Sequence, residues 1–372
     1  MTSDASRMVG ARLAGRYRLT RLLGQGGMGA VFEAQNADGT ATCALKVLNP
    51  EFRDDPDVKG RFFDEARAAA LLSHPGIVRV FESALAEDGT PFFTMELCAG
   101  RSLAEVIAQR TAMAPAEVVA LGLATLSALG HAHERGVVHR DLKPENVFYG
   151  GDPLHPDVTL LDFGLARVMD AAGGVGRRTR TGMLLGTPGY ISPEQLGDAR
   201  TADARSDLYS VGVMLFELFS GRDPFPAANP FEKLTIMLTA EAPRIADGSP
   251  SLAPLDAFFR RALAPEPRLR FPSAREMSAA LIASAGPLLA GASAVPGDVS
   301  GPATMASARL VATTQLSTLT HDTGGAAPPS VRVVSQRDLE RARRRRLLAI
   351  VAAVAAALTL LTGAVLLVAH VS

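Results

Sequence analysis

The sequence predicts a mixed α+β folded body, followed by a linker and a single membrane-spanning helix. Three observations lead to this prediction. Residues 16–285 alternate apolar periodic stretches with short turns such as Ala37-Asp38-Gly39, as compact folded sequence does. Residues 286–331 change to Ala, Gly, Ser, Thr and Pro without a sustained helical or strand period, which indicates a flexible linker. Residues 347–369 contain no charged side chain.

The overall composition excludes several classes of protein. With 372 residues, 47% hydrophobic and 20% charged, the chain is too apolar to be largely disordered and too polar for a polytopic membrane protein. The net charge of zero gives no global attraction to nucleic acid. Cys43 and Cys98 are the only cysteines, so there is neither a disulfide framework nor a four-thiolate metal site. Residues 1–15 lack the apolar core of a signal peptide, and we expect an N-terminal extension that stays in the cytoplasm.

A glycine-rich motif begins at Gly24 and reads Gly-Gln-Gly-Gly-Met-Gly. Glycines without side chains let backbone amides approach a phosphate closely. A dinucleotide-binding fold needs a helix directly after such glycines, but here an Asp38-Gly39 turn and a second strand, Thr42–Leu48, follow. The glycines are therefore expected in a β-hairpin. A hairpin that binds no ligand remains the alternative.

Lys46 lies in the otherwise apolar strand Thr42–Leu48. It is either a lysine at a sheet edge that extends its ammonium group to water or a buried cation with a fixed partner. The following helix, predicted over Val58–Ser73, places Glu65 on the same face as Phe62 and Ala69. A carboxylate on an apolar face is costly unless it meets a cation. We therefore predict an ion pair between Lys46 and Glu65.

A polar cluster, His139 to Asn146, is enclosed between apolar pairs, and a strand beginning at Val158 delivers Asp162 shortly afterwards. Asp141, Asn146 and Asp162 offer only oxygen ligands, which favours Mg²⁺ over zinc or copper. Each residue alone has the simpler interpretation of a turn former. Their combination indicates a site.

With these motifs, residues 16–280 resemble a eukaryotic-like (Hanks-type) protein Ser/Thr kinase, most closely the bacterial membrane-anchored branch. The resemblance implies a bilobal fold. Its N-lobe, about residues 16–97, is β-rich with one main helix, and its C-lobe, about 98–285, is mainly helical. The implied activity is transfer of the ATP γ-phosphate to Ser/Thr hydroxyls of proteins, with Mg²⁺ or Mn²⁺ as cofactor.

The resemblance also implies roles for individual residues. Asp141 accepts the proton of the substrate hydroxyl, Lys143 neutralises the γ-phosphate, and Thr187 bonds to both. Asn146 and Asp162 bind the metal. Lys46, paired with Glu65, holds the α/β-phosphates. The remaining nucleotide-binding residues are Gly24, Gly26, Gly29, Val31, Ala44, Met95, Glu96 and Cys98, of which Glu96 and Cys98 belong to the hinge beside adenine.

Four further matches concern support and regulation. Asp207 matches the buried carboxylate that braces the catalytic loop, and Arg270 matches the partner of Glu194 in Ser192-Pro193-Glu194, where the family usually has Ala-Pro-Glu. Arg140, beside Asp141, would bind a phosphate on the activation segment. Thr179 and Thr181 are the candidates for that phosphate, which adds roughly −1.5 to −2 of charge. The alternative is a solvated basic loop whose threonines have no role.

The C-terminal part combines a basic segment with an apolar run. Residues 332–346 contain seven arginines against Asp338 and Glu340, a net charge of +5. The 23 residues 347–369 would extend about 34 Å as a helix, enough to cross a core of roughly 30 Å. Positive charge before the span favours the cytoplasmic side, so we expect a single-pass protein of the inner membrane with a short tail, 370–372. A buried core helix, or nucleic-acid binding by the arginines, is the alternative.

Two other functions are compatible with the sequence. A membrane-tethered scaffold could use a catalytically inactive kinase fold, and a tyrosine-specific enzyme would differ at Lys143. The expected partners are proteins bearing Ser/Thr and the membrane, with no nucleic acid. A homodimer through the N-lobe is a further expectation taken from the resemblance. The sequence does not identify the protein substrate or the activating signal.

Overall fold

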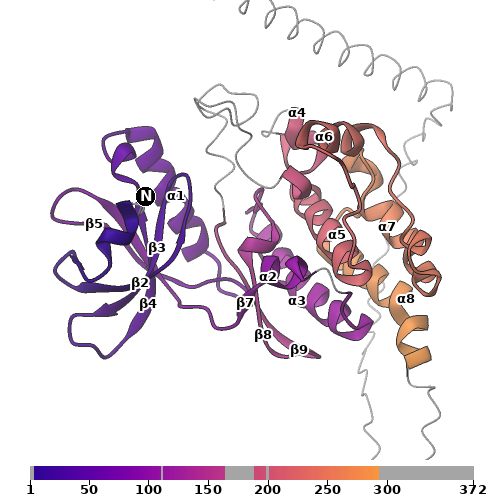
Figure 1. The fold of residues 1–372 in the computed structure, drawn as a ribbon, viewed down its shortest axis with the longest axis horizontal. Helices are drawn as coiled ribbons and strands as arrows, with labels where there is room; N and C mark the ends of the chain where they lie inside the picture. The colour runs from indigo at the N-terminus through magenta and orange to yellow at the C-terminus, as the bar shows by residue number, and fades with distance from the viewer. Residues whose placement is uncertain (1–3, 110–111, 164–187, 198–200, 293–372) are drawn as a thin grey trace, which may run out of the picture. The chain divides into compact units, whose positions relative to one another are not determined.

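The computed structural model describes residues 4–109, 112–163, 188–197 and 201–292. They form two lobes, an N-lobe built on a β-sheet and a mainly helical C-lobe, as the sequence predicts (Figure 1). The candidate phosphorylation sites Thr179 and Thr181 lie outside the described residues, and so does Thr187, the predicted partner of Asp141 and Lys143. So do the basic segment and the predicted membrane span.

The N-lobe is built on a six-stranded antiparallel sheet in the order β1-β2-β3-β4-β6-β5. The glycine-rich motif joins β2 to β3, so the hairpin predicted for it is present. The strand register sets Lys46 between Val31 of β3 and Phe93 of β6. The strands are β1 (Arg12–Leu13), β2 (Tyr17–Gln25), β3 (Gly29–Asn36), β4 (Thr42–Leu48), β5 (Val80–Leu85) and β6 (Pro91–Met95).

Strand β4 is buried on both faces because each face of the sheet has its own core. Cys43, Leu45 and Val47 pack with Phe32 and Phe92 on one face. Ala44 and Leu48 alternate with them and pack on the other face against α1. Side chains alternate along a strand, so Lys46 shares the α1 face. This alternation brings a lysine to the interior of the lobe.

Helix α1 (Pro56–Ala70) begins at a well-formed N-cap. Asp55 accepts hydrogen bonds from the backbone N–H groups of Asp57 and Val58, and Pro56 occupies the first helical position. The helix starts two residues earlier and ends three residues earlier than predicted. Its buried residues are Phe62, Glu65, Ala66 and Ala69. Glu65 therefore faces the sheet together with the apolar side chains, as its spacing indicated.

The N-terminal residues depart from the prediction of an extension outside the domain. Residues Asp4–Met8 form a 3-10 turn, and β1 pairs with β2. Ala5 and Leu13 are buried in the core that β4 shares with Phe32. Only isolated apolar residues make these contacts, so no sequence period indicated them. At least residues 4–13 thus pack as part of the N-lobe.

The C-lobe consists of helices and a second, three-stranded antiparallel sheet, β7-β8-β9. The 3-10 turn at Pro144–Asn146 leads directly into β8, so the polar cluster lies at the start of this sheet. The strands are β7 (Arg101–Ser102), β8 (Val147–Asp152) and β9 (His155–Leu160). The helices are α2 (Leu103–Ala108), α3 (Pro115–Glu134), α4 (Pro193–Gly197), α5 (Ala204–Ser220), α6 (Pro230–Thr239), α7 (Asp256–Ala262) and α8 (Ala274–Ala292).

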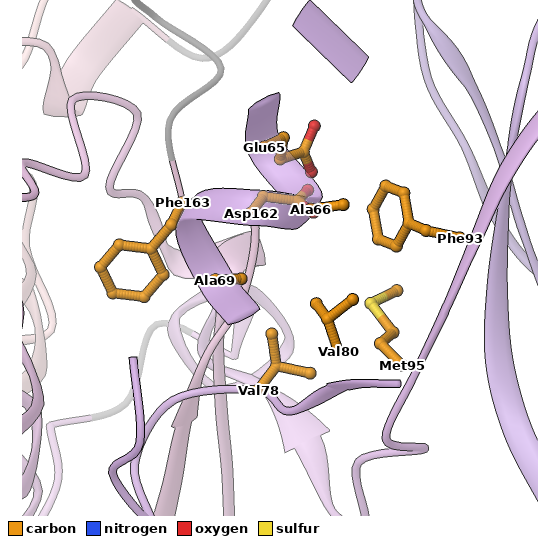
Figure 2. A pocket seen from close by; sticks show the side chains of 9 residues that line it. All are labelled: Glu65, Ala66, Ala69, Val78, Val80, Phe93, Met95, Asp162 and Phe163. Atoms are coloured by element: carbon orange, nitrogen blue, oxygen red, sulfur yellow. The ribbon is translucent and has the colours of Figure 1, made fainter. Parts of the chain in front are cut away.

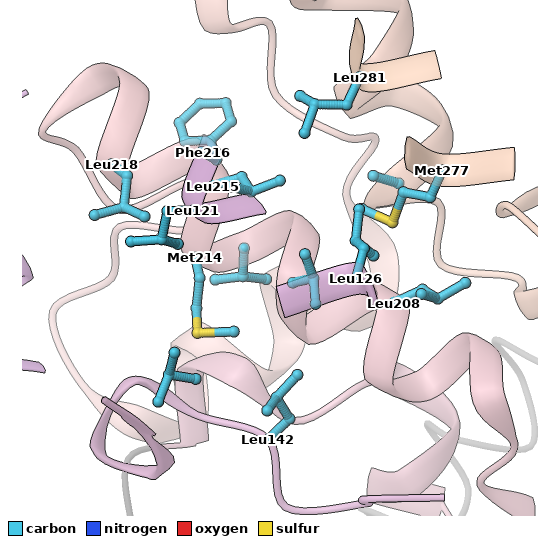
Figure 3. Close-up of a cluster of buried hydrophobic side chains, with 14 of the residues drawn as sticks. Leu121, Leu126, Leu142, Leu208, Met214, Leu215, Phe216, Leu218, Met277 and Leu281 are labelled. Carbon is cyan, nitrogen blue, oxygen red and sulfur yellow. The ribbon is translucent and has the colours of Figure 1, made fainter. Parts of the chain in front are cut away.

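The C-lobe core forms around α3 and α5, with α8 packed on α3 (Figure 3). Leu121 of α3, Leu215 of α5 and Leu281 of α8 all belong to this core, and so does Leu142 of the His139–Asn146 loop. Truncating one such leucine to alanine typically costs about 2–5 kcal/mol. Among the described residues, α3 alone is long and apolar enough to cross a membrane, but half of it is buried within this core.

Helix α8 also corrects the predicted start of the linker. The prediction placed the start of the linker at residue 286, where the composition changes to Ala, Gly, Ser, Thr and Pro. The helix instead continues to Ala292 through Pro287. Proline inside a helix removes one hydrogen bond and strains the preceding turn. Leu288 packs against the C-lobe core, and this contact favours continuation of the helix over a break.

Candidate active site

The glycine loop leaves open space where side chains would otherwise stand. A Cβ at Gly24 or Gly26 would meet nothing within 4 Å, whereas one at Gly29 would collide with the Val47 carbonyl. The loop is held from within by the Gly26 N–H, which donates to Gly29 O at 2.8 Å. Asn49 Nδ2 adds a bond to Gly27 O at 3.2 Å. These hydrogen bonds fix the loop backbone, while the space beside Gly24 and Gly26 stays open.

Lys46 lies at the centre of a buried charged cluster. Its Nζ donates to Glu65 Oε1 at 2.6 Å, the ion pair predicted from the sequence. It also donates to Asp162 Oδ1 at 3.0 Å, although Asp162 lies 116 residues further along the chain. The ammonium group therefore joins α1 of the N-lobe to the segment that follows β9.

This cluster carries one cation and two carboxylates in a space that excludes most water. Burial opposes the charged form of Lys46, but the carboxylates of Asp162 and Glu65 raise its pKa above the usual value. Burial raises the pKa of Glu65, and the Asp162 charge adds to that effect while Lys46 opposes it. Glu65 Oε2 is buried without a hydrogen-bond partner among the described residues. The cluster therefore sets two carboxyl groups against a single ammonium group.

A small apolar cavity, large enough for about one water molecule, lies behind this cluster. It is lined from α1, β5, β6 and the segment after β9, and Figure 2 shows the Glu65 and Asp162 carboxyl groups at its upper end. Met95, the last residue of β6, forms one wall. Phe163 is fully buried, with its ring 4.7 Å from the ring of His139.

The chain segment after β6 is the predicted hinge. Glu96 donates its backbone N–H to Arg79 O at 2.9 Å, and its carbonyl accepts a weak hydrogen bond from Cys98 Sγ at 3.9 Å. Burial raises the pKa of the Cys98 thiol to about 11, so the thiol is neutral at physiological pH. Val31 and Ala44, on adjacent strands of the sheet, are part-buried and buried respectively. Val31, Ala44 and Met95 thus provide an apolar surface beside the hinge backbone.

The catalytic loop brings Asp141 and Lys143 together. Lys143 Nζ donates to Asp141 Oδ2 at 2.7 Å, and both side chains are partly exposed. Asn146 Nδ2 donates to Asp141 O at 2.9 Å, so its Oδ1 atom remains an acceptor. The Asn146 carbonyl accepts the Leu161 N–H, which places Asn146 beside Asp162. The three oxygen-bearing residues singled out in the sequence therefore lie in one region.

Asp207 of α5 supports the catalytic loop through hydrogen bonds to its backbone. Its two carboxylate oxygens accept the backbone N–H groups of His139 at 2.9 Å and Arg140 at 2.8 Å, and Oδ2 also lies 2.8 Å from His133 Nε2. Arg140 and Asp162 have left-handed backbones, with φ of 66° and 56°. Such a conformation costs about 1–3 kcal/mol at a residue other than glycine and is typical of functional sites. The bonds from Asp207 help to hold the strained Arg140 in place.

A second buried ion pair lies deeper in the C-lobe. Arg270 donates from Nη1 and Nη2 to the two oxygens of Glu194, at 2.9 and 2.7 Å. Next to it, Gln195 donates to Arg140 O at 2.7 Å and so connects this pair to the catalytic loop. Sequence reasoning missed Gln195 and also Asn49. Each is a single polar residue outside any motif, so no signal in one sequence distinguishes it.

The donor set fits a magnesium ion. Asn146 and Asp162 supply neutral and anionic oxygens, the ligands that Mg²⁺ prefers. Among the described residues no group of three or more His, Cys, Asp or Glu side chains could hold a metal. A metal held here would complete its shell with water and with oxygens of a phosphate substrate, as Mg²⁺ commonly does.

Comparison with known proteins agrees with this geometry. A family model described as "Protein kinase domain" matches residues 17–278. Serine/threonine-protein kinase pkn3 of Myxococcus xanthus is 39% identical over 285 residues, covering 75% of this chain and 52% of pkn3. Serine/threonine-protein kinase PknL of Mycobacterium tuberculosis is 38% identical over 279 residues, covering 74% of this chain and 67% of PknL.

A solved structure gives the same result for the fold. The crystal structure of the M. tuberculosis PknI kinase domain aligns with a TM-score of 0.57 and 30% identity, covering 75% of this chain and 98% of that domain. The chain spans about half, or less, of the length of several curated relatives, such as 52% of pkn3 and 39% of the probable kinase SCO3848 of Streptomyces coelicolor.

Proposed function

The chain belongs to the protein kinase domain family, and we propose that it is an ATP-dependent protein serine/threonine kinase. The observation that carries this proposal is the bond of Lys46 to both Glu65 and Asp162, close to the Asp141–Lys143 pair. Relatives 35–39% identical to the chain are named serine/threonine-protein kinases. Substrates and partners of the whole protein belong to the same proposal.

The proposed reaction is transfer of the terminal phosphoryl group of ATP to a hydroxyl oxygen. A bond forms between that oxygen and the γ-phosphorus, the bond from the γ-phosphorus to the bridging oxygen breaks, and ADP leaves with the electron pair. Asp141 takes the hydroxyl proton on its carboxylate. Lys143 stabilises the negative charge of the transferring group, and Lys46 holds the α/β-phosphates.

The other predicted residues have supporting tasks in this proposal. Gly24, Gly26 and Gly29 let the loop backbone approach the phosphates. Asn146 and Asp162 hold Mg²⁺, which when bound supplies positive charge to the phosphate oxygens. Adenine would contact Val31 and Ala44, with Met95 lining the pocket behind it and backbone bonds at Glu96 and Cys98.

Two substitutions separate this proposal from an inactive kinase-fold scaffold. Lys46→Met removes the phosphate-binding ammonium group, and Asp141→Asn removes the proton acceptor. Each is expected to lower transfer of ³²P from ATP to a general protein substrate by at least about 10³-fold. Lys59→Met, a lysine of α1 away from the site, is the matched control and keeps wild-type activity. A wild type that transfers no phosphate would support the scaffold instead.

We further propose an activation switch through Thr179 and Thr181. A phosphate on either residue would bind Arg140, whose Nε is buried without a partner among the described residues. Phosphopeptide mapping after incubation with Mg-ATP should find at least one of them modified, and the double Thr→Ala variant should lose activity. Full activity of that variant would reject the switch. Thr187, which belongs to the same segment as Thr179 and Thr181, would bond to Asp141 and Lys143 of the catalytic loop.

We also propose that residues 347–369 anchor the protein in the inner membrane, with the kinase domain in the cytoplasm. The support is the uncharged 23-residue run behind seven arginines. Deletion of residues 341–372 should move the protein from the membrane fraction to the soluble fraction with activity retained. A full-length protein that is already soluble would refute the anchor.

A homodimer through the N-lobe is the last proposal of this kind, and it rests on the resemblance alone. Sedimentation of the truncated protein, residues 1–340, would test it. A single monomeric species across micromolar concentrations would refute it.

A further inference from the structure

Asn49 lies directly after β4, beside the tip of the glycine loop, and bonds to the loop at more than one point. Its backbone N–H donates to Met28 O at 2.9 Å. Its side-chain Nδ2 donates to Gly27 O at 3.2 Å, with a longer bond of 3.4 Å to Gly26 O. Three successive carbonyl groups of the loop tip therefore point towards this one residue.

The conformation of Asn49 is set by its neighbour in the chain. Pro50 begins a 3-10 turn, Pro50–Phe52, and Asn49 occupies its N-cap position with an extended backbone, φ −58° and ψ 140°. A proline disfavours the helical region for the residue before it and so keeps Asn49 extended. The side chain of an N-cap asparagine commonly accepts a backbone N–H. Here the side chain makes no capping bond, and its amide donates to the glycine loop instead.

Peptide geometry converts these bonds into an orientation of the N–H groups of the loop. In a planar trans peptide the C=O of one residue and the N–H of the next point in opposite directions. The carbonyls of Gly26 and Gly27 are held towards Asn49, so the N–H groups of Gly27 and Met28 point away from it. Neither N–H donates to a carbonyl in the described part of the chain. The loop tip thus offers two N–H donors on the side opposite Asn49.

This orientation matters because a phosphate attracts hydrogen-bond donors and repels acceptors. Successive backbone N–H groups in a turn form an anion-binding concavity, whereas carbonyl oxygens carry partial negative charge. If the peptides of the loop tip turned over, carbonyl oxygens would take the place of the N–H groups. Glycine allows such changes at low cost, because it populates positive and negative φ about equally. A loop with glycines at positions 24, 26, 27 and 29 therefore needs an external bond to keep one orientation.

We propose that Asn49 is a positioning residue for the nucleotide phosphates: its bonds hold the carbonyls of the loop tip away from the phosphates and keep the N–H groups of Gly27 and Met28 turned towards them. Asn49 acts through the loop and needs no contact of its own with the nucleotide. The inference rests on the proposed function, because it takes the glycine loop as the phosphate-binding element. Loss of the Asn49 amide should therefore weaken binding of the phosphates and leave binding of adenosine unchanged.

The test compares two ligands that share adenosine and differ in phosphate. With the full chain and Mg²⁺, titration calorimetry measures the Kd of β,γ-methylene-ATP, an analogue whose terminal phosphate is not transferred. Displacement of this analogue gives the Kd of adenosine. Asn49→Leu keeps a branched side chain of similar size and removes the donor. It is expected to raise the Kd of the analogue roughly tenfold and to leave the Kd of adenosine within about twofold of the wild-type value.

Three further variants separate the amide from the fold. Asn49→Gln restores a side-chain amide and should return the Kd of the analogue to within about threefold of the wild-type value. Asn49→Ala removes the donor and leaves its space empty, so it should separate the two ligands as Asn49→Leu does. It keeps the inference testable if the leucine variant does not fold. Asn36→Leu, at the opposite end of β3 from the glycine loop, is the matched control and should change neither Kd.

Results against Asn49 differ from results against the proposed function. An unchanged Kd of the analogue in Asn49→Leu or Asn49→Ala would overturn the positioning role. Equal weakening of the analogue and adenosine would also overturn it, because a structural defect of the lobe affects both ligands. A wild type that does not bind the analogue would overturn the phosphate-binding loop and this inference with it. A chain that separates the two ligands as expected but transfers no phosphate would refute the kinase activity and leave the role of Asn49 intact.

Discussion

Two buried ion pairs of this molecule have opposite characters. Arg270 and Glu194 form a two-fold hydrogen-bonded pair, and Arg270 also donates to the carbonyls of Ala264 and Pro265. Burial would raise the pKa of Glu194, yet the bonds from Arg270 and Ser206 hold it below its usual value. Every donor and acceptor of this pair is used for structure.

The cluster around Lys46 is incomplete by comparison. It holds one cation against Glu65 and Asp162, and one oxygen of Glu65 has no partner among the described residues. Both pairs are buried, so burial alone does not distinguish structure from function. What distinguishes them is whether the charges are satisfied, since an unsatisfied cluster has capacity left for substrate phosphate and metal.

The largest effect is expected from breaking the satisfied pair. Arg270→Met leaves the Glu194 carboxylate buried without its cation, which typically costs about 3–5 kcal/mol. Urea unfolding of the variant against the wild type measures this loss. Arg268→Met is the control, because Arg268 forms an exposed pair with Glu266 and should change the free energy of unfolding by less than about 1 kcal/mol. Equal effects of the two substitutions would refute the structural role.

A substitution in the Lys46 cluster should lower activity and not stability. Glu65→Gln removes a carboxyl group whose charged form is disfavoured by burial, but it also removes the anchor of Lys46. We therefore expect kcat/KM to fall about 100-fold while stability at pH 8 does not decrease. The pKa of Glu65 is raised in the folded state, so the wild type loses stability as pH rises above 4.5. The variant should lack this decline.

Steady-state kinetics and urea unfolding at pH 6 and pH 8 provide both readouts. Asp64→Asn is the matched control, since Asp64 is its exposed neighbour on α1. If Glu65→Gln were destabilised by several kcal/mol at pH 8, the cluster would be structural like the Glu194 pair.

The smallest effect is expected from removing one hydrogen bond of the Glu194 carboxylate. Ser206 donates to Glu194 Oε1 at 2.6 Å, and Ser206→Ala should cost about 1–2 kcal/mol. A lowered folded pKa gives stability that is present above the unfolded pKa and is lost as pH falls. The variant raises the folded pKa of Glu194, so acid unfolding should begin at a higher pH. An unchanged acid transition would show that Ser206 does not tune this carboxylate.

Hydrophobic periodicity along the sequence predicted the elements whose buried face it determines. Strand β4 has the predicted bounds, and the spacing of Glu65 on an apolar helix face was sufficient to pair it with Lys46. Hydrophobic periodicity encodes which face of an element is buried, and a charge on that face needs a partner. The pairing of Arg270 with Glu194 came from the resemblance to a known family, because neither residue has a local signal.

Other features depend on contacts that no local pattern records. The bond from Lys46 to Asp162 joins residues 116 positions apart, and the left-handed backbone of Arg140 and Asp162 is imposed by packing and by the bonds from Asp207. The continuation of α8 beyond residue 285 depends in the same way on the seat of Leu288 in the C-lobe core.

The most direct test of the account is the chemical identity of the phosphorylated residue. Wild-type protein is incubated with Mg²⁺, [γ-³²P]ATP and a general protein substrate, and the product is hydrolysed for phosphoamino-acid analysis beside an Asp141→Asn control. The account predicts label on serine or threonine that the control lacks. Label on tyrosine alone, or equal label with the control, would contradict it.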